Sequence, residues 1–299
     1  MKRRLPLALT GLLLGLTALT NLITKFVNRP VGYSLLLLCL GLWLVLAGYF
    51  LLNKKDCQKQ LTSLLAASTF PTYFMAMMLS PLVLPLAKPY LLSIWALGLL
   101  GHLTFLILFS IRAKKQASWE QVYPGWFVIY VGPAAASITA RLVGQVLLGQ
   151  VIFYLTFLAY LILMLALFYR LAKWPLREQE LPNIAIMAAP SSLLLLAFLQ
   201  LYPSGHPAFL LLLLLLSQGF YWGSFLYLAR HLKTWFVPGF SAFTFPSVST
   251  ATALKLSLMR LQLTEGWLVS LSNFEIGLAS LIVAYVALAY LYYLSKSKA

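Results

Sequence analysis

The residues that could handle a ligand in this chain are prolines, hydroxyls and phenylalanines inside apolar segments, rather than paired acids and bases. Four prolines stand within such segments at near-even intervals: Pro71, Pro133, Pro190 and Pro246. A proline inside a helix frees a carbonyl oxygen, because proline has no N–H and its ring clashes with the preceding turn. In a membrane, freed backbone groups are tolerated only where they meet other protein or a water-filled cavity. The four prolines therefore predict helices that line something polar.

Small and hydroxyl residues gather around the same four prolines. The residues that we expect to line a pathway or to form its kinks are Thr69, Pro71, Gly132, Pro133, Ser137, Pro190, Ser191, Thr244, Pro246 and Ser247. Small and hydroxyl residues also let membrane helices pack closely. For any one helix, packing is an alternative that the sequence leaves open.

The elements that position these residues are membrane helices. The chain is 62% hydrophobic and only 9% charged, with mean hydropathy +0.88, which excludes an ordinary soluble domain of 299 residues. Apolar runs of about 20 residues each span a bilayer. They predict a single transmembrane domain over residues 1–299 with spans near 5–24, 32–52, 62–84, 89–112, 125–143, 145–172, 182–201, 207–229, 238–258 and 268–295.

These spans alternate in character along the chain. The even-numbered spans are almost purely apolar and have no interior proline, whereas the third, fifth, seventh and ninth carry the prolines and hydroxyls. The first span fits the second class loosely, through Gly11 and Gly15. The pattern predicts an all-α polytopic membrane protein of five helical hairpins, in which five inner, pore-lining helices are ringed by five outer helices.

The net charge of +16 is explained by topology rather than by nucleic acid. With the N-terminus inside, most of the 22 Lys and Arg residues fall on the inner side, and the outer side keeps Lys25, Arg29, Lys88, Arg141, Lys255 and Arg260. Such a bias over short loops is the positive-inside rule. It predicts a multi-pass protein of the plasma (inner) membrane with both termini in the cytoplasm. We therefore expect the lipid bilayer as a partner and no nucleic acid.

The charges nearest the expected axis are positive. No centre of an inner span carries an ionisable residue, and the six acidic residues fall in loops or near span ends. A cation path usually has acidic rings. Arg141 and Lys255 follow Pro133 and Pro246 toward the outside, where their charges would attract anions to an outer mouth. The alternative for each is an ordinary cation at a helix end. The pattern favours small inorganic or organic anions as the ligand.

Two phenylalanines could close such a path. Phe70 and Phe245 each precede a proline within identical Thr-Phe-Pro triplets. Rings that project into an axis exclude water, and hydrophobic constrictions gate pores by dewetting. Ordinary packing is the alternative for both residues.

Other classes of function find less support. The three histidines lie in different segments without metal-ligand spacing, and no nucleophile stands beside a base, so we expect no catalytic residue, no metal and no cofactor. A proton-coupled carrier needs a titrating group, for which His102 and Glu275 are the near-membrane candidates. A non-transporting membrane scaffold is a more distant alternative.

The chain resembles the tellurite-resistance/dicarboxylate transporter family, which includes plant slow anion channels, the yeast malate permease and fungal sulfite pumps. The resemblance covers essentially the whole chain and is carried by the segment around Pro71 and by Leu9-Thr-Gly-Leu-Leu-Leu-Gly15, Tyr123-Pro-Gly-Trp-Phe-Val-Ile-Tyr-Val-Gly-Pro133, Ala188-Ala-Pro-Ser191 and Ser241-Ala-Phe-Thr-Phe-Pro246. It implies a ring of five inner helices around a pore, a homotrimer of separate pores, and Phe245 as the residue that occludes the pore. A proton-coupled carrier of C4-dicarboxylates, or a sulfite transporter, stays open as the alternative.

Overall fold

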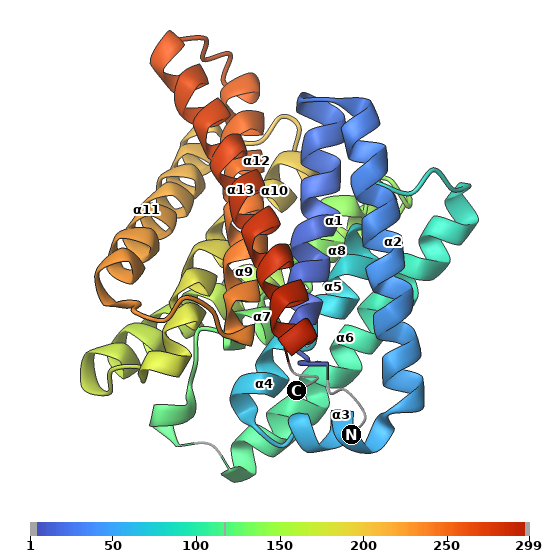
Figure 1. Cartoon of the computed structure of the whole chain (residues 1–299). Helices are drawn as coiled ribbons and strands as arrows, with labels where there is room; N and C mark the ends of the chain where they lie inside the picture. The colour runs from blue at the N-terminus through green and yellow to red at the C-terminus, as the bar shows by residue number, and fades with distance from the viewer. Residues whose placement is uncertain (1–4, 117, 297–299) are drawn as a thin grey trace.

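The fold is built from helices of two kinds, long continuous ones and short interrupted ones. We describe it from a computed structural model, which covers residues 5–116 and 118–296. Seven helical segments of this described part are long and apolar enough to cross a membrane: α1 (Leu9–Phe26), α2 (Arg29–Leu52), α6 (Lys88–Gln116), α9 (Val146–Lys173), η3 with α10 (Glu178–Leu201), α11 (Pro207–His231) and α13 (Gly266–Lys296). The protein is therefore an integral, multi-pass membrane protein (Figure 1).

Three of the ten expected spans are not continuous helices. The span expected over 62–84 consists of α4 (Leu64–Thr69), α5 (Thr72–Leu79) and the short 3₁₀ helix η1 (Ser80–Leu82). The span over 125–143 consists of α7 (Trp126–Tyr130) and α8 (Ala134–Thr139), and that over 238–258 of the 3₁₀ helix η4 (Pro238–Phe243) and α12 (Thr244–Arg260). The described part thus confirms a polytopic helical membrane protein, while the ten-helix hairpin arrangement stays a prediction. Two further short helices, α3 (Lys54–Gln60) and η2 (Trp119–Gln121), lie in connections.

The interruptions fall at the prolines. Pro71 and Pro133 directly precede α5 and α8, while Pro190 and Pro246 lie in the first turns of α10 (Ala189–Leu201) and α12. Proline fits the first turn of a helix, where its missing N–H needs no partner. Upstream of Pro190 and Pro246 the chain is 3₁₀ helix, with η3 covering Glu178–Ala188. Pro71 and Pro133 therefore begin new half-helices, whereas Pro190 and Pro246 mark a change from 3₁₀ to α-helix within one helical segment.

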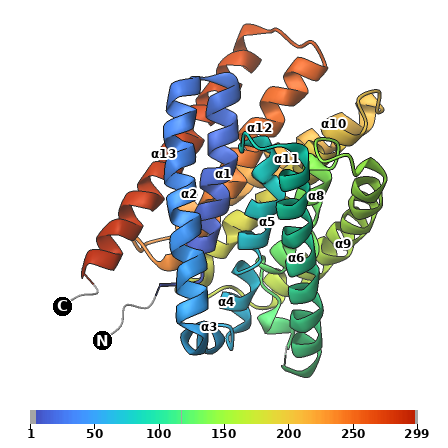
Figure 2. The same cartoon turned by 90° about the vertical axis from the view of Figure 1, so that its right-hand side faces the viewer.

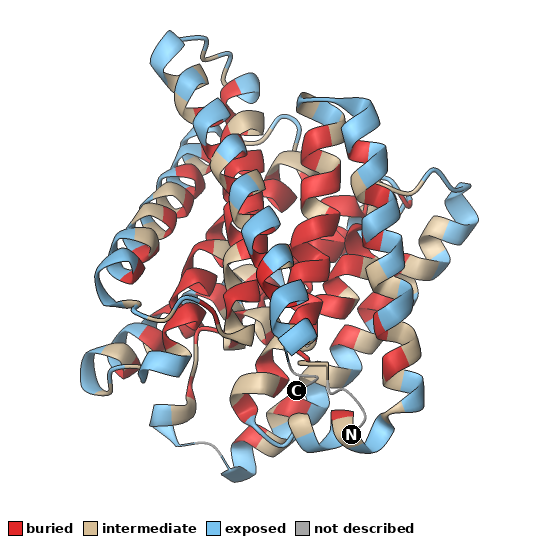
Figure 3. Ribbon diagram, viewed as in Figure 1, coloured by how far each residue is buried: buried red, intermediate tan, exposed pale blue. Residues whose placement is uncertain are grey.

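Burial divides the elements into a central and a peripheral set. In the η3–α10 segment 89% of the residues in its apolar 18-residue stretch are buried, against 22% in the corresponding stretches of α2 and α6. Helix α12 is buried along most of its length, whereas α9 and α11 expose rows of large apolar side chains. Figure 3 shows the buried residues gathered around the middle of the molecule and the exposed ones on its outer helices. The exposed apolar faces are those that lipid would cover.

The central elements meet closely at α1 and α12. Helix α1 packs against α2, α5 and α12 (Figure 2). Gly11 and Gly15 of α1 face Ser241 and Thr244. The hydroxyl of Thr244 donates to the carbonyl oxygen of Gly11 at 3.0 Å, a bond that ties the start of α12 to α1. Small residues let two backbones approach in this way.

Candidate functional site

A small cavity lies where the interrupted helices break. Its volume is about 40 Å³, and α1, the two proline breaks before α5 and α8, the start of α10 and the start of α12 all contribute to its wall. Only three of its lining side chains are polar, namely Thr69, Thr72 and Ser241. A cavity needs roughly 10–15 Å³ for each water. The space, which we call the break cavity, therefore holds a few water-sized particles.

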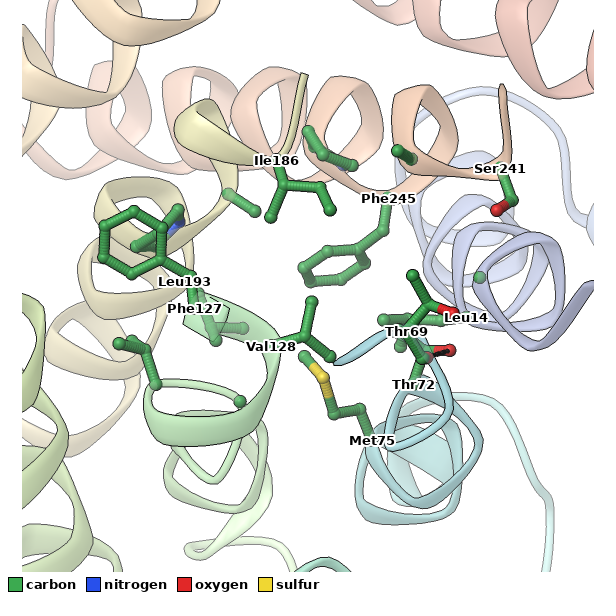
Figure 4. A pocket seen from close by; sticks show the side chains of 17 residues that line it. Leu14, Thr69, Thr72, Met75, Phe127, Val128, Ile186, Leu193, Ser241 and Phe245 are labelled. Carbon is green, nitrogen blue, oxygen red and sulfur yellow. Dashed lines mark hydrogen bonds between the residues drawn. The ribbon is translucent and has the colours of Figure 1, made fainter. Parts of the chain in front are cut away.

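Phe245 projects into the break cavity from the first turn of α12. Figure 4 shows its ring between Ile186 on one side and Leu14 and Thr69 on the other, above Val128 and Met75. The side chain is only 6% exposed. An apolar ring in this position excludes water from the centre of the cavity.

A second cavity lies on the other side of the same ring. It has a volume of about 50 Å³ and is more polar than the break cavity, with Asn21, Lys25, Gln200, Ser249 and Thr252 in its wall. Phe245 lines this space too, and Lys25 and Gln200 come from the far ends of α1 and α10. We call it the outer cavity. One phenylalanine side chain therefore separates two cavities that follow each other along α12.

Helix ends meet at the breaks around the first cavity. Thr72, Ala189 and Phe245 are first or second residues of α5, α10 and α12, and all three line it. The N-terminal end of a helix carries a partial positive charge from its aligned peptide dipoles. The preceding segments α4, η3 and η4 end at the same breaks, and their C-terminal ends carry the opposite partial charge. The two sets of helix ends therefore offset each other, and they assign no net charge preference to the cavity.

His102 has a structural role at one of the breaks. It is fully buried on α6, and its Nε2 atom lies 3.0 Å from the carbonyl oxygen of Ile129. That carbonyl stands four residues before Pro133, which has no N–H to bond it. His102 thus supplies the donor that proline withholds. This position explains a buried histidine on a peripheral helix without a proton relay.

The expected lining residues fall into two groups. Thr69, Gly132, Pro190, Pro246 and Phe245 line the break cavity, as do Thr72 and Ser241, which were not among those singled out. The others are not among the residues lining either cavity, and the outer cavity has Ser249 and Thr252 as its hydroxyl residues. Pro71 and Pro133 stand at the breaks as the residues before α5 and α8.

Four expected lining hydroxyls bond backbone carbonyls instead. Ser137 donates to Gly149 at 2.8 Å, and Ser247 donates to Phe243 at 2.8 Å. Thr244 donates to Ser241 and Gly11, and the Ser191 hydroxyl lies 3.4 Å from the carbonyl oxygen of Ala188. A hydroxyl in an apolar surrounding gains most from satisfying the nearest carbonyl. These four residues therefore fit the alternative raised for small and hydroxyl residues, in which they serve helix packing.

Phe70 lies away from both cavities. Its ring packs at centroid distances of 5.3 Å from Phe50, 5.7 Å from Phe74 and 5.2 Å from Phe105, which belong to α2, α5 and α6. Its neighbours Thr69 and Thr72 face the break cavity, so the ring of Phe70 points the other way, toward the peripheral helices. The two Thr-Phe-Pro triplets therefore place their rings differently.

The expected outer cations are near the outer cavity but do not line it. Arg141 donates from Nε to Gln200 and from Nη2 to Leu201, at 3.1 and 3.2 Å, so that it holds the carbonyl end of α10. Lys255 is half-buried on α12, next to Leu256 of the cavity wall. The cation that lines the cavity is Lys25. The position of Lys25 at the C-terminal end of the central helix α1 could have identified it, but the argument from the prolines reached only residues downstream of them.

Comparison with known families agrees with this geometry. The model of the SLAC1 family, described as voltage-dependent anion channel, matches residues 4–293. The chain belongs to this family. A search of curated proteins found no significant match. Membership identifies a membrane transport protein for anions rather than an enzyme, and it confirms the resemblance seen in the sequence.

Proposed function

We propose that the protein is a channel-like pathway for small anions, closed in this structure by the ring of Phe245. The observation that carries the proposal is that this one side chain lines both the break cavity and the outer cavity. Moving the ring aside would join the two spaces along α12. Lys25 in the outer cavity would favour anions along the joined path.

The proposed architecture around this path is the five-hairpin ring. The central set, α1, α4–α5, α7–α8, η3–α10 and η4–α12, would form the inner ring, and α2, α6, α9, α11 and α13 the outer one. Burial of the first set and exposure of the second support this arrangement. We further propose a homotrimer in the plasma membrane with cytoplasmic termini, supported by the resemblance and by the positive-inside bias.

Lys25 is expected to concentrate anions at the outer cavity. A unit charge about 6 Å away in water contributes roughly 0.7 kcal/mol, which is about a threefold change in local anion concentration. Lys25→Gln should therefore lower anion flux about threefold at low ionic strength and much less at 0.5 M salt, because salt screens the charge. The flux is measured in liposomes at both salt concentrations. Lys88→Gln, which removes an outer cation that is not among the cavity-lining residues, is the matched control. An equal effect of the two variants would contradict this role.

The alternative, a proton-coupled carrier of C4-dicarboxylates or sulfite, has a candidate group in Glu275. This carboxylate is fully buried on α13, and it accepts hydrogen bonds from Gln218 at 3.3 Å and Trp222 at 3.2 Å, both on α11. Buried carboxylates inside membranes are functional candidates. Glu275 lines neither the break cavity nor the outer cavity, however, and its bonds join two peripheral helices. We therefore assign it to helix packing.

Flux in liposomes with an imposed proton gradient tests this choice. For a channel we expect the anion flux to follow voltage and anion concentration, to be indifferent to the proton gradient, and to persist in Glu275→Gln, which keeps the shape of the side chain. Glu265→Gln, at an exposed residue, is the control. Acceleration of flux by an inward proton gradient, lost only in Glu275→Gln, would favour the carrier and overturn the channel.

A further inference from the structure

A larger groove lies outside the two cavities, between α9, η3 and α11. Its volume is about 270 Å³, and its wall is formed mainly by apolar side chains such as Phe168, Leu171, Met187 and Phe220. In Figure 1, α11 is set off to one side of the molecule, beside the end of α9. We call this space the α9–α11 groove. It faces the bilayer, so that its natural occupants are apolar.

Two glycines leave the α11 side of the groove open. Gly219 and Gly223 are one helical turn apart, and both line the groove. A Cβ atom built on either one would meet no atom within 4 Å. The helix therefore presents bare backbone here, where a leucine would fit without a clash. A smooth apolar trough of this kind suits an unbranched hydrocarbon chain.

The groove runs from the connection after α9 along the side of α11. Pro175 and Leu176, in the connection after α9, line one end of it, and Gly219 lies eight residues before Tyr227 on α11. At 1.5 Å per residue that distance along α11 is about 12 Å. The groove is thus long enough for a substantial part of an acyl chain.

Basic residues surround the surface end of the groove. Lys173 ends α9, Arg177 follows Leu176 of the groove wall, and Arg230 lies in the last turn of α11, all three with exposed side chains. The acids on this side are Glu120, Glu178 and Glu180, and Glu180 accepts hydrogen bonds from the Tyr123 hydroxyl and the Arg177 backbone N–H. Arg170 of α9 is a fourth cation, whose guanidinium donates to the backbone carbonyl of Glu120. Four cations therefore stand against three acids here. Clusters of Lys and Arg beside membrane helices attract anionic headgroups.

We propose that the α9–α11 groove binds an anionic phospholipid of the inner leaflet. One acyl chain lies over Gly219 and Gly223, and the headgroup phosphate lies among Lys173, Arg177 and Arg230. The site does not depend on conduction. It does adjoin the pathway, because Ile184 and Met187 of η3 line the groove while Ile186 between them lines the break cavity. An acyl chain bound in the groove would pack against η3 on the side opposite the break cavity and so support the wall that faces Phe245.

Retention of phospholipid by the purified protein tests this site. Wild-type protein is mixed with phosphatidylglycerol or phosphatidylcholine of the same acyl chains, and bound lipid is counted by native mass spectrometry. We expect phosphatidylglycerol to be retained in preference, and Gly219→Leu and Gly223→Leu to lose that retention. Gly48→Leu is the matched control, because its Cβ also meets nothing within 4 Å but it belongs to α2.

A second set of variants tests the headgroup without filling the groove. Lys173→Gln, Arg177→Gln and Arg230→Gln should each weaken phosphatidylglycerol retention about fivefold and leave phosphatidylcholine unchanged. Equal retention of the two lipids by wild type, or unchanged retention in both glycine variants, would overturn the proposal. A change in oligomeric mass in the glycine variants, with lipid retention unaltered, would show that a second copy of the chain occupies the groove and would overturn it equally. None of these readouts requires conduction, so the proposal can fail or stand independently of the proposed channel.

Discussion

Phe245→Ala is expected to raise anion conductance at least about tenfold, because a barrier lowered by only about 1.4 kcal/mol already gives that factor. The ring is the side chain shared by the break cavity and the outer cavity. Truncation to a methyl group removes the apolar surface that keeps water from the gap between them. The conductance is measured in planar bilayers or in oocytes, with expression at the surface quantified in parallel.

The cost in stability should be small for so large a truncation. Phe→Ala in a close-packed core costs about 3–5 kcal/mol, part of which comes from the cavity left behind. Phe245 already borders two cavities, so its removal breaks fewer packing contacts than in a filled core. We therefore expect a monodisperse protein with a cost near the lower end of that range.

Phe70→Ala is the matched control, since both rings stand in Thr-Phe-Pro triplets. Phe70 packs against three other rings, two of them on the peripheral helices α2 and α6 and one on α5, and such aromatic pairs contribute about 0.5–1.5 kcal/mol each beyond area burial. Its removal should lower the thermal midpoint without raising conductance. The double variant should conduct like Phe245→Ala alone. Folded Phe245→Ala protein that conducts no better than wild type would contradict the role of Phe245 as the gate.

Once the pathway is open, an ion-substitution series on Phe245→Ala would identify the anion. Thr69, Thr72 and Ser241 are the polar side chains of the break cavity, and no fixed charge stands among its lining residues. Such a wall distinguishes anions chiefly by size and by the cost of removing their water. The permeability order of chloride, nitrate, sulfite and malate is the readout.

The sequence predicted the membrane character and the places of the breaks. Hydropathy identifies membrane spans because a segment that crosses the bilayer must be apolar over a fixed length, and this requirement applies to every residue of the span. The four prolines marked the breaks because proline's missing N–H acts locally, whatever surrounds it. The kind of break was beyond the sequence, since a kink and a new half-helix differ only in how neighbouring helices satisfy the freed groups.

The roles of individual side chains were harder to predict, because they depend on which way each half-helix faces. Thr244 and Ser247 flank the gate in sequence, yet their hydroxyls bond carbonyls of α1 and of their own segment. Identical triplets place Phe70 toward the lipid-facing helices and Phe245 toward the cavities. His102 could be understood only once Ile129 was seen beside it. Rotation about a helix axis, which no local pattern fixes, decides such cases.

The second large effect is expected at Gly15, where α1 packs tightly against the start of α12. A Cβ atom on Gly15 would lie 2.5 Å from Cβ of Thr244 and 3.2 Å from the backbone nitrogen of Phe245. Contacts this short force helices apart, and overpacking of a filled site costs about 1–3 kcal/mol. Gly15→Ala should lower the thermal midpoint by roughly 3–9 °C, at about 3 °C for each kcal/mol in a chain of this size.

Gly41→Ala makes the same chemical change with the opposite expected sign. Gly41 is exposed on α2, and its Cβ would meet nothing within 4 Å. Alanine there gains the helix propensity that glycine lacks, about 1 kcal/mol, without a clash. The thermal midpoint should therefore stay the same or rise. Equal midpoints for the two variants would show that α1 and α12 have room between them.

The contact at Gly15 also bears on the gate. Because a Cβ at this position meets the backbone nitrogen of Phe245 as well as Thr244, separation of α1 from α12 would shift the first turn that holds the ring. Thr244→Gly removes the side chain that clashes with the added Cβ in Gly15→Ala. The double variant should therefore recover part of the decrease in the thermal midpoint. Neighbouring sites couple by about 0.5–3 kcal/mol in such cycles. A coupling near zero would contradict the close contact between Gly15 and Thr244.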